Sequence, residues 1–229
     1  MIKCFLVWLL GFVVWSLPVS AAGVTAASMT YKNFARESAD DRFRNLWEMT
    51  GMQIRAARTR WSYETNLRLE AIGAASHFET QLAFLTLATE EFYVTLYEER
   101  AANAEVREHS WRTRAAAVEA GRPEPLLDIA QADLDLRKQK LIIAQKLVDW
   151  SNEIDATSRD LEERAASLLV GGAMDREDYN FYLELKTLGR SAVTLGAEEL
   201  VKARELLQEA QRDLDDVTGH AVTGSGPRR

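Results

Sequence analysis

Proline and cysteine are both scarce in this chain, and each scarcity excludes a class of structure. Only four prolines occur in 229 residues, which leaves residues 24–122 and 126–226 free of proline. These four are Pro18, Pro123, Pro125 and Pro227. Proline costs roughly 3 kcal/mol inside a helix, so the two stretches permit long helices. The single cysteine, Cys4, lies in the apolar start of the chain; once that segment is removed, no disulfide, thiol catalyst or zinc-thiolate site is possible.

Positive charge is also in short supply. The chain has 28 lysines and arginines against 35 aspartates and glutamates, which gives a formal net charge of −7. Nucleic acids and anionic membrane surfaces attract basic proteins, so an acidic chain is a poor candidate for binding either of them. We therefore expect protein partners, no nucleic acid, and only an indirect association with a membrane.

Long hydrophobic runs are missing except at the start of the chain. Lys3 is followed by an apolar run, residues 4–15, and then by small residues that end in Ala21 and Ala22. This order is typical of a secretory signal peptide, which we predict for residues 1–22. The alternative is a retained membrane anchor, but the run is shorter than the roughly 20 residues that span a bilayer. The pattern therefore predicts an exported protein.

The first half of the mature chain has the spacing of helices. We expect a loose lead-in over residues 23–30, one amphipathic helix from Tyr31 to about Gly51, and no strong break between about 53 and 120. Gly73 falls inside that last stretch, where a single glycine weakens a helix by only about 1 kcal/mol. Apolar residues at helical spacing predict a buried seam formed by Phe78, Leu82, Leu85, Phe92 and Leu96.

Two glycine-containing corners divide the rest of the chain. We predict corners near 121–125 and near 171–175, and a helix between them from Pro125 to about Val170. Asp175 is a plausible N-cap of the last helix. Residues 218–229 are rich in glycine and serine and basic at their end, a composition that predicts a disordered tail.

Apolar residues repeat every seven positions in both of these later helices. Leu147, Ile154, Leu161 and Leu168 form one such row. In the last helix a row of large residues runs beside a row of small ones: Val193, Leu200, Leu207 and Leu214, then Gly196, Ala203, Ala210 and Val217. Small residues at one seam position let two helix backbones approach closely. We therefore predict an all-α fold of long antiparallel helices, with no barrel strands. Residues 23–217 would form one elongated coiled-coil domain, whose exposed apolar seams favour a homo-oligomer.

Catalytic and metal-binding motifs are absent from the sequence. None of His77, His109 and His220 has a second histidine three or four residues away. Carboxylates are plentiful, but adjacent acids on a helix point about 100° apart and form no acid–base pair. Trp47, Trp61, Trp111 and Trp150 are consistent with a ligand groove, although packing along a seam is the favoured interpretation. We predict no enzyme activity, no cofactor and no metal.

One segment resembles a known family. Residues 116–136, read as AAVEAGRPEPLLDIAQADLDL, together with KLIIAQ at 140–145, are similar to the helix–tip–helix portion of TolC-type outer-membrane efflux proteins. The resemblance covers about residues 105–155. It implies that the tip docks on the hairpin of a periplasmic adaptor protein. The tip residues carried over are Gly121, Arg122, Pro123, Glu124, Pro125 and Asp128. Members of that family are longer chains that also contribute barrel strands.

Three functional hypotheses follow. The first is a non-enzymatic helical-hairpin protein of the periplasm, or of the periplasmic side of the outer membrane. It would be a component or accessory of an efflux or secretion assembly. The second is a soluble periplasmic coiled-coil scaffold or holdase chaperone. The third, an enzyme with an unrecognised helical site, is the least favoured.

Overall fold

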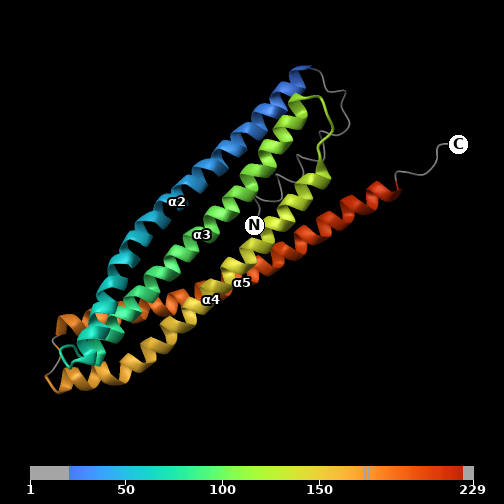
Figure 1. Ribbon diagram of the computed structural model, residues 1–229. Coiled ribbons are helices and arrows are strands. Elements are labelled where there is room, and N and C mark those ends of the chain that lie inside the picture. Colours follow the sequence, from blue (N-terminus) through green and yellow to red (C-terminus); the bar gives the residue numbers. More distant parts are fainter. Residues whose placement is uncertain (1–20, 173, 175, 224–229) are drawn as a thin grey trace.

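The computed structural model describes residues 21–172, 174 and 176–223, and within them the chain is all-helical. Four helices follow one another: α2 (Ala21–Ala71), α3 (His77–Glu119), α4 (Leu126–Val170) and α5 (Arg176–Thr223). Figure 1 shows a long bundle in which α2 lies beside α3, α3 beside α4, and α4 beside α5. The all-α fold predicted from the sequence is therefore confirmed.

A turn at residues 72–76 corrects the expectation of an unbroken helix through Gly73. Gly73 adopts a φ of +71°, the left-handed conformation that ends helices and that glycine reaches without strain. Ser76 then caps α3: its hydroxyl accepts from the Glu79 amide, and the Glu79 carboxylate accepts from the Ser76 amide at 2.7 Å. This reciprocal capping favours the start of a new helix at Ser76. The chain therefore turns here, although one continuous helix could have tolerated the lone Gly73.

The two predicted corners are present. Gly121 and Gly172 have φ values of +61° and +70° and end α3 and α4 respectively. The α3–α4 corner lies at one end of the bundle beside the start of α2, and the other two turns lie together at the opposite end (Figure 1).

Other expected boundaries differ from the structure. Residues 23–30 belong to α2, so the loose lead-in was wrong. Residues 218–223 continue α5, where the Thr218 hydroxyl donates to the Leu214 carbonyl at 2.9 Å, so this part of the predicted disordered tail is wrong too. A single glycine at 219 does not stop a helix in that position. The predicted leader up to residue 20, the cap at Asp175 and residues 224–229 lie outside the described residues.

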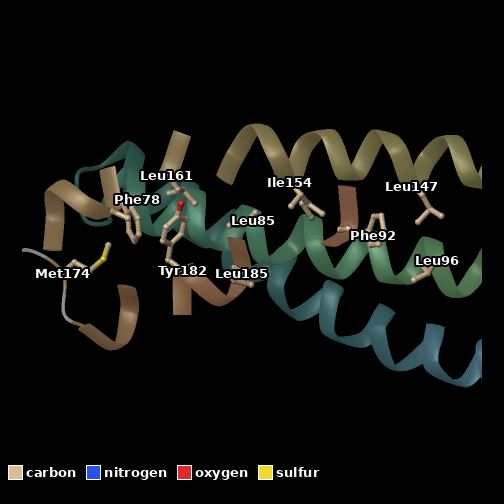
Figure 2. Close-up of a cluster of buried hydrophobic side chains, with 13 residues drawn as sticks. Phe78, Leu85, Phe92, Leu96, Leu147, Ile154, Leu161, Met174, Tyr182 and Leu185 are labelled. Carbon is tan, nitrogen blue, oxygen red and sulfur yellow. The ribbon is translucent and has the colours of Figure 1, made fainter. Parts of the chain in front are cut away.

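The hydrophobic core lies among α3, α4 and α5. It follows the predicted rows in α3 and α4, but in α5 the predicted row of Val193, Leu200, Leu207 and Leu214 is only half-buried. Phe78, Leu85, Phe92 and Leu96 of α3 are buried against Leu147, Ile154 and Leu161 of α4, with Met174 and with Tyr182, Leu185 and Ala192 of α5. Figure 2 shows these side chains pointing into one continuous seam between the ribbons. Burying such residues removes apolar surface from water at about 25 cal/mol per Å², which is the main force holding the helices together.

Small residues bring α5 close to α4. A Cβ atom at Gly196 would lie 3.2 Å from the Leu147 carbonyl oxygen, and one at Gly189 would lie 2.5 Å from Cγ2 of Ile154. Ala203 and Ala210 continue the same seven-residue row and are also buried. Of the predicted row of small residues, Gly196 therefore lies directly against the α4 backbone.

Helix α2 packs on α3 alone among the described helices. Ion pairs cross this interface at intervals: Lys32 with Glu119, Arg42 with Glu108, and Arg60 with Glu91. Residues early in α2 therefore meet residues late in α3. No helix within the described ranges is long and apolar enough to cross a membrane.

Candidate docking surface at the α3–α4 corner

The corner between α3 and α4 is held in one conformation by its own backbone. The Arg122 amide donates to the Ala117 carbonyl at 3.0 Å, which uses one of the free acceptors at the end of α3. Leu126 donates to the Glu124 carbonyl at 2.9 Å, and Ile129 donates to the Pro125 carbonyl at 3.0 Å to open α4. Two prolines with fixed φ add stiffness to this short connection.

Glu124 points back into the bundle rather than out to solvent. The Tyr31 hydroxyl donates to its carboxylate at 3.0 Å, and the Arg114 guanidinium lies 3.1 Å from it. Burial, and then the negative charge of Glu124, raise the pKa of Tyr31. The carboxylate thus joins the corner both to α3 and to the start of α2.

Aromatic side chains extend this contact along α2. Trp111 of α3 stacks on Tyr31 with ring centroids 5.6 Å apart and packs on Phe34 at 5.0 Å. The Arg114 guanidinium lies 5.6 Å from the Trp111 ring centre, within the range of a cation–π contact. Sequence reasoning missed Tyr31 as part of the site, because nothing in the local pattern places a residue 93 positions away beside Glu124.

The predicted tip residues divide into two groups. Arg122, Pro123 and Asp128 are exposed, whereas Glu124 and Pro125 are half-buried; Gly121 supplies the turn. Beside the exposed group, Leu126 and Leu127 are 39% and 47% exposed. The outward surface therefore combines a cation, a carboxylate and two apolar side chains on a stiff backbone. These groups suit docking on a protein, and they provide no nucleophile or acid–base pair.

A second exposed surface lies on α2. Trp47 and Trp61 are 71% and 70% exposed, so the interpretation that they pack in a seam was wrong for both. They lie on the side of α2 that faces away from α3. Trp111 and Trp150 do pack, the first on Tyr31 and the second against the core.

Two further polar features lie outside the corner. His77 at the start of α3 lies 2.7 Å from Glu70 and 4.0 Å from Asp160, so it links three helices at one end of the bundle. No group of three or more metal-ligating side chains occurs among the residues that the structure describes. A depression of about 200 Å³ between α4 and α5 is lined by charged residues that pair with one another, such as Lys186 with Glu162.

Comparison with known proteins adds no relative to this picture. The chain matches no protein-family model, no curated protein and no solved structure.

Proposed function

We propose that this chain is a non-enzymatic periplasmic helical-hairpin protein, a component or accessory of an outer-membrane efflux or secretion assembly. The observation that carries the proposal is the α3–α4 corner. Its backbone is stiff, Glu124 anchors it inward, and Arg122, Leu127 and Asp128 face solvent. The same segment resembles the adaptor-docking tip of TolC-type proteins, and a periplasmic adaptor is the proposed partner.

The proposal includes an antiparallel coiled-coil arrangement of the helices. Support comes from residue pairs whose numbers rise along α2 and fall along α3, namely Ser28 with Glu119, Arg42 with Glu105, and Arg60 with Glu91. Further support comes from the buried seven-residue row of Leu147, Ile154 and Leu161 in α4. Such an arrangement would place the docking corner at the far end of a rod.

Partner docking can be tested at the corner itself. The double variant Arg122→Glu/Leu127→Ser changes two exposed side chains and leaves the core intact, so the fold should be kept. A matched control is Val170→Ser, which removes an 89% exposed apolar side chain at the opposite end of the bundle. Co-purification with outer-membrane fractions or with an adaptor should be lost in the corner variant and kept in the control. Equal co-purification of both variants would contradict the docking role.

Export is tested separately by fractionating cells that express the full chain. The proposed signal peptide, residues 1–22, predicts a product in the periplasmic fraction whose N-terminus begins after Ala21 or Ala22. An intact N-terminus on a product that stays in the cytoplasm would rule out a periplasmic role.

A periplasmic scaffold or holdase chaperone is the second candidate. It is favoured by the exposed apolar side chains of α2, because such surface can hold unfolded clients. Purified protein would then suppress aggregation of unfolded outer-membrane proteins. Replacing Trp47 and Trp61 by serine should abolish that suppression, whereas the corner variant should keep it.

A further inference from the structure

The outward side of α2 carries a continuous row of large apolar side chains. Phe43, Trp47, Ile54 and Trp61 follow one another at steps of four, seven and seven, which places them on one face of a helix. They are 70%, 71%, 62% and 70% exposed. We call these four residues the α2 stripe. Because α2 packs only on α3, no other described helix of this chain covers the stripe.

The size of the α2 stripe fits a protein interface. At 1.5 Å per residue it is about 27 Å long. Three aromatic side chains and one isoleucine at these exposures present roughly 500 Å² of apolar surface. A standard interface buries about 800 Å² per partner, and in homodimers roughly 65% of that area is apolar, which again is about 500 Å². The α2 stripe alone therefore supplies the apolar area that one side of a stable dimer needs.

The α2 stripe is complementary to its own reversed copy. In an antiparallel alignment centred on Met52, position 43 lies opposite 61, position 47 opposite 57, and position 50 opposite 54. Phe43 then meets Trp61, and the large Trp47 meets the small, exposed Ala57. Alternation of large and small side chains is what lets two helix faces interdigitate.

Charges beside the α2 stripe favour the same alignment. Glu48 and Arg55 are seven residues apart on one flank, both are exposed, and neither has an ion-pair partner among the described residues. An antiparallel helix pair brings the same flank of both helices together, so Glu48 would lie opposite position 56 of the other copy, one residue from Arg55, twice by symmetry. In a parallel pair, Glu48 would instead lie level with Glu48 of the other copy, and Arg55 with Arg55, so that like charges would meet.

We propose that the α2 stripe is the docking surface for a second copy of this chain, packed antiparallel about a two-fold axis near Met52. The dimer uses α2 and leaves the α3–α4 corner free. A result that disproves the dimer would therefore leave the proposed function untouched, and a result that disproves the proposed function would leave the dimer untouched.

The first experiment measures the mass of the purified full chain by sedimentation equilibrium over a range of concentrations. The wild-type chain should reach twice the mass of one chain. Trp47→Glu or Trp61→Glu should weaken the dimer by at least about 30-fold, as expected for large aromatic residues that anchor an interface. The matched control is Ile142→Glu, because Ile142 of α4 is 62% exposed but lies outside the α2 stripe, and it should leave the mass unchanged. A monomer at every concentration, or equal weakening by the control, would overturn the proposal.

Two further readouts test the register. In a Cys4→Ser background, Gly51→Cys lies near the two-fold axis with nothing within 4 Å of its Cβ, and should form a disulfide-linked dimer on mild oxidation. Arg36→Cys lies seven residues before Phe43 on the same face and should not cross-link, since its own copy is at the far end of the helix. Cross-linking of both variants to the same extent would show a parallel pair and contradict the proposal.

Charge reversal supplies an independent check. Glu48→Arg should weaken the dimer, and Glu48→Arg/Arg55→Glu should restore it to within about threefold of wild type, because the pair is re-formed with opposite signs. A double variant as weak as the single one would contradict the assigned pairing.

Discussion

Lys140 of α4 lies 2.7 Å from Glu99 of α3, and both side chains are almost completely buried, with 4% and 2% exposure. Two opposite charges away from water are costly unless they meet, so this pair favours one alignment of α3 against α4 over neighbouring ones. The seven-residue rows alone would also allow α3 to pack on α4 with a shift of seven residues. Such a shift would leave both buried charges unpaired.

Breaking this pair should destabilise the protein strongly. Glu99→Ala leaves the Lys140 ammonium buried without a partner, which costs about 3–5 kcal/mol, while Glu99→Leu/Lys140→Met should be close to neutral. Asp135→Asn is a matched control, because its ion pair with Lys138 is more than half exposed and should contribute little to stability. Urea unfolding followed by circular dichroism measures all three variants. A loss of the same size in the single and double variants would contradict the account.

Tyr182 should titrate far from the usual range. Burial, followed by the charge of Glu162, raises its pKa from 10.0 to about 12. Because the folded state holds this proton more tightly than the unfolded state, the contribution to stability is present below pH 10 and is lost as pH rises towards 12. Ultraviolet absorbance titration should show one tyrosine near 12 that disappears in Tyr182→Phe.

The same variant should reduce stability modestly. The Tyr182 hydroxyl donates to the Ser158 carbonyl at 3.1 Å, and loss of one buried hydrogen bond costs about 1 kcal/mol. Tyr179→Phe is the control, since no hydrogen bond of the Tyr179 hydroxyl is found among the described residues. Equal stability of the two variants would argue against a role for the Ser158 bond.

Acid should loosen the contact between the ends of α2 and α3. Hydrogen bonds from Lys32 and then from Ser28 lower the pKa of Glu119 below 4.5. A lowered carboxyl pKa adds stability above the unfolded value and loses it as pH falls through the folded one. Glu119→Gln should therefore lower the melting temperature by about 1–3 °C at neutral pH, and the difference should vanish well below pH 4.5. Persistence of the difference in acid would point to a cause other than ionisation.

The glycines of α5 should resist replacement. Gly196→Ala puts a methyl group 3.2 Å from the Leu147 backbone oxygen, so α4 and α5 must separate slightly and stability should fall by about 1–3 kcal/mol. In α2, Gly51→Ala meets nothing within 4 Å and should raise stability by about 0.5–1 kcal/mol, the usual gain in a helix interior. Thermal unfolding at low protein concentration compares the two, and a gain in both would contradict the close approach.

Most of the fold could be predicted from local pattern. The absence of proline, the seven-residue rows and the glycines at 121 and 172 indicated the helical class and two of the three turns. The third turn was missed because Gly73 was weighed alone. The available signal was the capping-box spacing of Ser76 and Glu79, which indicates the start of a new helix just after Gly73. The ends of α2 and α5 were missed because residues 23–30 and 218–223 are mostly small or polar and carry no apolar row. The predicted end of a helix near Gly51 was also wrong, because α2 continues through that glycine to Ala71.

The candidate surfaces could be predicted only in part. The corner residues 121–125 are contiguous in sequence, so their turn chemistry was visible. The inward direction of Glu124 depends on Tyr31 and Arg114, which belong to two other helices. Likewise, the spacing of Trp47 and Trp61 shows that they share a helix face, but it cannot say whether that face meets a neighbour. Only the placement of α3 on the opposite side of α2 decides this.

Among the described helices, α2 has one neighbour, α3, whereas α4 has two, α3 and α5. Opening of α2 breaks one interface, whereas opening of α4 breaks contacts with both α3 and α5. Backbone amides of α2 should therefore exchange with heavy water sooner than those of α4, through partial openings that leave the Leu147–Ile154–Leu161 seam closed. Helix α2 can therefore open while α3, α4 and α5 stay packed on one another.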